Sequence, residues 1–148
     1  MVSKKLSCIF LASGHSKRFH GNKLLAPLEG RPLVQHVFEH LPAHMFHQVL
    51  VVTRYPQVAQ LAQALRFTPI LNPDPTDDIA VTIRLGLEHL EQDMGGCMFS
   101  VCDQPFLSLP VSPLWFRSFK LTPTPLPLWH IRENVAIPSS FPEHCFPN

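Results

Sequence analysis

Short apolar runs alternate with segments of helical periodicity along most of the chain. The apolar runs, which predict buried β-strands, are residues 6–11, 48–53, 66–71 and 97–102. The segments with apolar residues at every third or fourth position, which predict amphipathic helices, are residues 33–41, 57–65 and 79–90. Strands that alternate with helices at this spacing favour βαβ units. We therefore predict an α/β fold, a three-layer Rossmann-like and mostly parallel sheet with helices on both faces.

The predicted topology also indicates where a ligand would bind. In open parallel sheets, ligands bind beyond the carboxyl ends of the strands. Three polar stretches follow predicted strands, namely residues 13–23, 72–78 and 103–105. We expect these stretches to meet at one edge of the sheet.

The first of these stretches has the composition of a phosphate-binding turn. Gly14 and Gly21 allow the backbone to bend closely around a ligand and to turn N–H groups toward it. Arg18 and Lys23 supply the positive charge that a polyphosphate needs. The alternative is an ordinary strand-to-helix loop with exposed cations, because a glycine-rich loop alone is a weak signal. The Walker-type pattern GxxxxGK[ST] is absent from the sequence.

Asp103 directly follows the strand predicted over residues 97–102. Mg²⁺ takes a few oxygen ligands from a protein and completes its shell with substrate phosphate and water. A carboxylate at the end of a buried strand suits that role. The alternative is an aspartate that caps a turn.

The order of residues in the first stretch resembles the signature LAxGxSxRFGxxKLL of the MobA-like nucleotidyltransferases. The matching positions are Leu11, Ala12, Gly14, Ser16, Arg18, Phe19, Lys23, Leu24 and Leu25. His20 departs from the pattern, because it stands where the family has glycine. Cys102-Asp103-Gln104-Pro105 resembles the second signature of the family, (G/C)DxP, whose aspartate binds the metal.

The resemblance implies a fold of the nucleotide-diphospho-sugar transferase type and a transfer of a nucleoside monophosphate from an NTP, with release of pyrophosphate. Its implied catalytic residues are Lys23, Arg18 and Asp103, with Asp103 also holding Mg²⁺. Its implied nucleotide-binding residues are Leu11, Ala12, Ser13, Gly14, Ser16, Asn72 and Thr82. The last two belong to a weaker match, in which Asp78, Ile79 and Ala80 replace a Gly-Met-Ser helix start. Asp77 and Asp78 would repel a phosphate there, and their alternative role is to cap the helix.

The resemblance is closest to the molybdenum cofactor cytidylyltransferases. It implies CTP rather than GTP as the nucleotide and a phosphorylated pterin, molybdopterin, as the acceptor. It leaves open a molybdoenzyme as a protein partner. Sugar-phosphate and methylerythritol-phosphate nucleotidyltransferases have a similar opening loop and are the enzymatic alternative.

The resemblance covers residues 5–112 well and the remainder poorly. Residues 105–148 are rich in proline, and the run Val135–Pro138 predicts one edge strand at most. The Gly-x-Pro segment and the Gly-Asp pair of the family, which carries a second metal ligand, are not found before Asn148. We therefore expect one domain over residues 1–148 that is incomplete at its C-terminus. A catalytically inactive nucleotide-binding protein is the alternative from another functional class.

Composition and charge limit the classes of binding partner that we expect. A chain of 148 residues with 45% hydrophobic residues can form one core. A formal net charge of +1 gives no reason to expect binding to nucleic acid or to an anionic membrane surface. We expect a cytoplasmic protein, because the first apolar run is too short for a signal peptide or a spanning helix. The oligomeric state is not predicted. The repeat of His36, His40 and His44 predicts a surface stripe rather than a zinc site.

Overall fold

The computed structural model describes residues 5–16, 21–103, 129–132 and 135–138. Its centre is a four-stranded sheet in the order β5-β4-β1-β6. The strands are β1 (Lys5–Ala12), β4 (Gln48–Thr53), β5 (Thr68–Leu71) and β6 (Met94–Val101). Every neighbouring pair in this sheet is parallel. The predicted α/β class and parallel sheet are confirmed.

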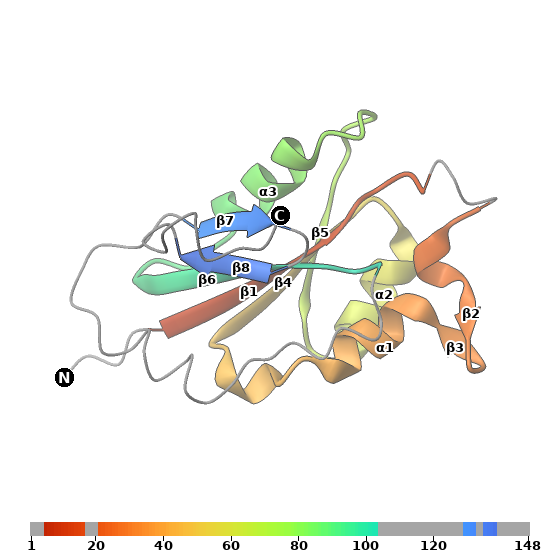
Figure 1. The fold of residues 1–148 in the computed structure, drawn as a ribbon, viewed down its shortest axis with the longest axis horizontal. Coiled ribbons are helices and arrows are strands. Elements are labelled where there is room, and N and C mark those ends of the chain that lie inside the picture. Colours follow the sequence, from red (N-terminus) through yellow and green to blue (C-terminus); the bar gives the residue numbers. More distant parts are fainter. Residues whose placement is uncertain (1–4, 17–20, 104–128, 133–134, 139–148) are drawn as a thin grey trace, which may run out of the picture.

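Helices cover both faces of the sheet, as the periodicity predicted. They are α1 (Leu33–His40), α2 (Pro56–Ala64) and α3 (Ile79–Glu88). Figure 1 shows α3 on one side of the sheet and α1 and α2 on the other. Successive residues of β1 point to opposite faces, so Phe10 joins the core beneath α1 and α2 while Ile9 joins the core beneath α3. The three layers are therefore built on a central strand that is buried from both sides.

Aromatic packing dominates the core on the side of α1 and α2. The rings of Phe10 and Phe38 lie edge to face with their centroids 5.0 Å apart, and Phe67 contacts both. On this face His36 is buried, and its Nε2 atom lies 2.8 Å from the Leu28 carbonyl oxygen. The predicted surface histidine stripe is wrong for His36, because a carbonyl partner satisfies the ring inside the protein. No cluster of metal-binding side chains is found among the residues that the structure describes.

Shorter elements connect and flank this framework. Two are 3₁₀ turns, η1 (Lys23–Leu25) and η2 (Ala43–Met45), and four are short strands, β2 (Pro27–Leu28), β3 (Arg31–Pro32), β7 (Trp129–Arg132) and β8 (Val135–Pro138). Strand β8 confirms the edge strand predicted near the C-terminus, and it pairs with β7 in an antiparallel hairpin that the sequence did not predict. No helix in the described part of the chain is long and apolar enough to cross a membrane.

Helix α3 packs unusually close to the sheet at Gly86. A Cβ atom at this position would lie 2.7 Å from Ile9 Cγ2 and 3.4 Å from Val52 Cγ2. Ile9 and Val52 are fully buried, so neither side chain has room to move aside. The missing side chain at Gly86 therefore sets the distance between α3 and β1.

We expect Gly86→Ala to lower the free energy of unfolding by about 1 kcal/mol, because the cost of overpacking exceeds the gain in helix propensity. Urea denaturation measures the difference. Gly14→Ala is the matched control, because no atom lies within 4 Å of a Cβ atom built there and its backbone does not adopt a positive φ. If Gly86→Ala were as stable as the wild type, α3 would not be held at this distance by the glycine.

Candidate functional site

A pocket of about 730 Å³ opens at the carboxyl ends of β1 and β6. These two strands are neighbours in the sheet, although four other strands and three α-helices separate them in the sequence. The pocket is lined by Leu11, Ser13, Gly14, Ser16, Lys23, Leu24, Arg54, Asp77, Ile79, Thr82, Val101, Cys102 and Asp103. Each of the three polar stretches that the sequence analysis placed at this edge contributes to the lining.

Lys23 and Asp103 meet at the pocket. Lys23 Nζ lies 3.7 Å from Asp103 Oδ2, and the two side chains are 41% and 51% exposed. Asn22 fixes the start of η1, because its Oδ1 atom accepts a hydrogen bond from the Leu24 N–H. An ion pair this exposed contributes about 0–1 kcal/mol to stability. The pair is therefore better suited to hold a charged ligand than to hold the fold together.

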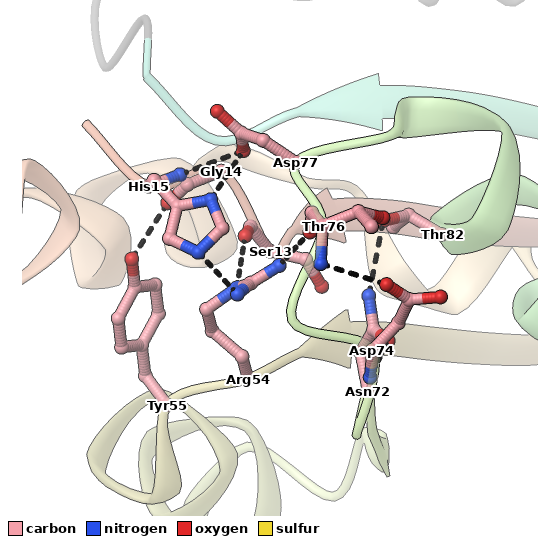
Figure 2. Close-up of polar contacts among 10 residues, drawn as sticks. All are labelled: Ser13, Gly14, His15, Arg54, Tyr55, Asn72, Asp74, Thr76, Asp77 and Thr82. Carbon is pink, nitrogen blue, oxygen red and sulfur yellow. Dashed lines mark hydrogen bonds and ion pairs between the residues drawn. The ribbon is translucent and has the colours of Figure 1, made fainter. Parts of the chain in front are cut away.

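Three consecutive residues at the carboxyl end of β4, namely Thr53, Arg54 and Tyr55, hold the loop after β1 from one side. Thr53 Oγ1 donates to the Ala12 carbonyl at 2.9 Å, and Arg54 Nε donates to the Ser13 carbonyl at 2.6 Å. Tyr55 Oη donates to the Gly14 carbonyl at 2.7 Å. Figure 2 shows Arg54 and Tyr55 reaching up to the loop. Three consecutive carbonyl groups are thus bound by three consecutive side chains.

This binding turns the N–H groups of the loop the other way. In a trans peptide the N–H of the next residue points opposite to the carbonyl, and no cis peptide is present among the described residues. The N–H groups of residues 13, 14 and 15 are therefore directed away from the side chains of Thr53, Arg54 and Tyr55. One of them has an anionic partner, because the His15 N–H donates to Asp77 Oδ1 at 3.0 Å. Backbone donors arranged in this way bind anions.

Arg54 also joins the loop to the turn that follows β5. Its Nη2 atom donates to the Thr76 carbonyl at 2.6 Å, and its Nη1 atom contacts His15 Nε2. The sequence analysis did not identify Arg54, Tyr55 or the contact of Asp77 with the loop. The signal was available for the first two, because Thr-Arg-Tyr lies at the carboxyl end of β4, on the same edge as the other stretches.

The predicted site residues divide into groups. Leu11, Ser13, Gly14, Ser16, Lys23, Thr82 and Asp103 line the pocket. Ala12 is fully buried and outside the lining. Asn72 is also buried, where its Nδ2 atom donates to Thr82 Oγ1 at 3.4 Å and its Oδ1 atom accepts from the Asp74 N–H. Arg18 lies outside the described residues.

The two glycines of the loop differ in backbone conformation. Gly14 does not adopt a positive φ, whereas Ser16 has a φ of 51° and Gly21 a φ of 116°. Among the described residues 13–16 and 21–23, positive φ therefore falls on Ser16 and Gly21. Because a Cβ atom at Gly14 would meet nothing within 4 Å, a glycine there leaves open space at the wall of the pocket. That space suits a ligand that approaches the backbone closely.

Nearby titratable groups keep simple protonation states. Burial, together with the charge of Asp103, raises the pKa of the Cys102 thiol well above its usual value, so Cys102 stays protonated and is not a nucleophile. Burial raises the pKa of Tyr55, so its hydroxyl remains a donor to the loop. Hydrogen bonds from the Thr76 side chain and backbone lower the pKa of Asp74, which stays ionised.

A divalent cation fits the chemistry of this pocket. Asp103 offers an exposed carboxylate at the end of a rigid strand, and Mg²⁺ needs only one or two carboxylates when a substrate supplies phosphate oxygens. The described residues hold no group of three or more metal-binding side chains, so a closed protein cage for a metal is not formed by them. The pocket therefore suits a metal that arrives with its ligand.

Comparison with known proteins identifies the family of the chain. The sequence model of the MobA-like NTP transferase domain matches residues 8–148. This match includes residues 113–148, where the sequence analysis found none of the later family motifs. None of the curated proteins matches the chain significantly.

Solved structures with a similar fold share little sequence with the chain. The CMP:2-keto-3-deoxy-manno-octonic acid synthetase complexed with CTP has a TM-score of 0.64 and 24% identity over 84% of this chain and 50% of that chain. A nucleotidyl transferase from Methanothermobacter has a TM-score of 0.60 and 22% identity over 77% and 56%. Rv0371c from Mycobacterium tuberculosis has a TM-score of 0.60 and 20% identity over 80% and 60%. In a complex with manganese, Rv0371c has a TM-score of 0.53 and 19% identity over 78% and 57%. The chain spans half to three fifths of the length of these structures.

Proposed function

Because the chain belongs to the family of MobA-like NTP transferase domains, we propose that it moves a nucleoside monophosphate from an NTP to a phosphorylated acceptor. An acceptor phosphate oxygen attacks the α-phosphorus, the bond from that phosphorus to the bridging oxygen breaks, and pyrophosphate leaves. The observation that carries this proposal is the meeting of Lys23, Asp103 and the loop over residues 13–16 in one pocket. Cation, carboxylate and backbone donors are what a transfer between phosphates requires.

Each group has a role in this transfer. The N–H groups of residues 13–15 bind the polyphosphate, and Lys23 neutralises charge at the α-phosphate. Arg18 retains its role from the resemblance, holding the β- and γ-phosphates as they leave. Asp103 would hold Mg²⁺, which when bound neutralises phosphate charge and aligns the two substrates. The manganese complex of Rv0371c supports a divalent metal in proteins with this fold.

We propose CTP as the nucleotide and molybdopterin as the acceptor. The resemblance of the chain to the cytidylyltransferase branch supports both, and a structural neighbour that is complexed with CTP supports the nucleotide. That neighbour is a synthetase of a CMP-linked sugar acid, and it favours a sugar-type acceptor as the second candidate. GTP is the alternative nucleotide.

The test is the release of pyrophosphate by the whole chain. The protein is incubated with Mg²⁺, each NTP in turn, and either molybdopterin or a sugar-type acceptor. We expect release with CTP and molybdopterin. Release only with a sugar-type acceptor would contradict the pterin assignment, and binding of CTP without any release would identify a nucleotide-binding protein instead of an enzyme.

Tyr55→Phe tests whether the loop must be held in place. The substitution removes only the hydroxyl group that donates to the Gly14 carbonyl. Loss of a neutral hydrogen bond costs about 0.5–1.5 kcal/mol, so we expect CTP to bind about 2- to 12-fold more weakly. Calorimetric titration measures the affinity, and thermal denaturation confirms that the fold persists. An unchanged affinity would mean that this carbonyl contact does not orient the loop.

A further inference from the structure

One carboxylate oxygen makes two contacts between Asp77 and the phosphate-binding loop. Asp77 Oδ1 lies 3.0 Å from the His15 backbone nitrogen and 3.0 Å from His15 Nδ1. Figure 2 shows the carboxylate directly above the loop, with the His15 ring beside it. The loop therefore has an anion on one of the N–H groups that face away from Thr53, Arg54 and Tyr55.

The surroundings of this oxygen are those of an anion site. The other ring nitrogen of His15 contacts the guanidinium of Arg54, which also binds the carbonyl groups of Ser13 and Thr76. Arg54 has five N–H donors, so these contacts do not exhaust it. Arg54 and Asp77 both line the pocket with Gly14. A backbone N–H and an imidazole thus contact a single negatively charged oxygen, and a guanidinium contacts the other nitrogen of that imidazole.

The start of α3 is fixed by the neighbour of Asp77. Asp78, and not Asp77, caps α3, because its Oδ1 atom accepts from the Ala80 N–H at 2.8 Å. The side chains of His15 and Asp77 are about one-third exposed, and an ion pair of this kind stabilises a protein weakly. Helix capping, the alternative role considered for both aspartates, is observed for Asp78. The contact of Asp77 with His15 therefore costs little free energy to break.

We infer that the Asp77 carboxylate occupies the position of a phosphate oxygen in the free protein and that the polyphosphate of the nucleotide replaces it. This inference rests on the proposed function and adds His15 and Arg54 to the groups that bind the nucleotide. Asp77 then competes with the substrate. The apparent affinity is reduced by the fraction of molecules in which Asp77 is bound to the loop.

Asp77→Asn tests this competition, with Asp78→Asn as the matched control. Both variants remove one negative charge from neighbouring positions, but only Asp77 contacts the loop. The first probe is inorganic tripolyphosphate, which has no base and undergoes no transfer, and the second is CTP. We expect Asp77→Asn to bind tripolyphosphate about 3- to 10-fold more tightly than the wild type, since a loop that is open a tenth of the time loses about 10-fold in affinity. We expect Asp78→Asn to change the affinity for tripolyphosphate by less than about 2-fold, because salt screens an exposed charge that does not contact the ligand.

Equal or weaker binding of tripolyphosphate by Asp77→Asn would overturn the inference, as would an equal gain in both variants. The backbone amide resonance of His15 gives an independent readout. It should shift when tripolyphosphate is added to the wild-type protein, and an unperturbed resonance at saturation would also overturn the inference. Tripolyphosphate binding that follows the expected order without any pyrophosphate release from NTPs would contradict the proposed function and leave the inference standing.

His15→Ala in the Asp77→Asn background tests the imidazole itself. The backbone N–H remains in this double variant, so only the ring is removed. We expect the double variant to bind tripolyphosphate several-fold more weakly than Asp77→Asn alone. Equal affinity would contradict the assignment of the imidazole as a binding group.

Discussion

Lys23→Ala is expected to slow nucleotidyl transfer by about 100- to 1000-fold, the loss that follows removal of one donor aimed at developing charge. Lys23 lines the pocket beside Asp103. Among the residues that the structure describes, its ammonium group is the one that forms an ion pair with that carboxylate. Stability should change little, because the ion pair that Lys23 makes is exposed. The rate of pyrophosphate release and the midpoint of thermal denaturation are the two measurements.

Two variants sharpen this prediction. Lys5→Ala removes an exposed lysine at the start of β1, far along the strand from the pocket, and should leave the rate unchanged. Lys23→Arg keeps the charge but replaces a compact ammonium by a planar guanidinium, so it should restore only part of the rate. Full activity in Lys23→Ala would remove Lys23 from the catalytic groups. If Lys5→Ala lost as much activity as Lys23→Ala, the change in net charge would be the cause.

Asp103→Asn is the second large effect. The substitution preserves the size of the side chain and removes the charge that would hold a divalent cation against the phosphates. Because such a cation supplies several kcal/mol of charge stabilisation, we expect transfer to fall by at least about 100-fold at a fixed Mg²⁺ concentration. The rate should also respond more weakly to added Mg²⁺. Measurement of rate against Mg²⁺ concentration separates a weaker metal site from a damaged fold.

Asp93→Asn is the control for Asp103→Asn. Asp93 is an exposed carboxylate that does not line the pocket, and its φ of 68° is one that asparagine tolerates. Asp93→Asn should keep the Mg²⁺ response of the wild type. If Asp103→Asn showed the same Mg²⁺ response as the wild type, Asp103 would not be the metal ligand.

The central sheet could be predicted because its two inner strands, β1 and β4, are apolar runs buried on both faces, whereas the edge strands β5 and β6 are only partly buried. The ends of elements were less predictable. Strand β6 begins at Met94, before the predicted start at Cys97, because Met94 and Gly96 still pair with β1 across a shift in register. Strand β5 begins at Thr68 because Arg66, with a φ of 62°, closes the turn after α2. Such boundaries depend on backbone conformation and pairing, which hydropathy does not encode.

The small hairpin of β2 and β3 was missed for a similar reason. Its turn, Glu29-Gly30, has positive φ at both positions, which is the turn that pairs strands tightly. The strands contain two prolines and are two residues long, so they carry no periodic pattern. Only Gly30 hinted at the turn.

The candidate site was predictable where it depends on the rule that ligands bind beyond the carboxyl ends of parallel strands. Lys23, Asp103 and the loop after β1 meet where the carboxyl ends of the strands placed them. Asn72 is buried and donates to Thr82, a residue that lines the pocket, so its amide joins the turn after β5 to α3. The contact of Asp77 with the loop was not predicted. The sequence analysis considered the repulsion between this carboxylate and a phosphate, but it did not consider the His15 N–H as a donor to the carboxylate. Which donor an exposed carboxylate meets depends on loop geometry.

Calorimetric titration of the whole chain with CTP in the presence of Mg²⁺ tests the central claim most directly. The claim is that the pocket between β1 and β6 binds a nucleoside triphosphate through the loop and Lys23. We predict saturable binding at one site, weakened by Lys23→Ala and unchanged by Lys5→Ala. The absence of binding to CTP and to every other NTP, or binding that Lys23→Ala leaves unchanged, would contradict it.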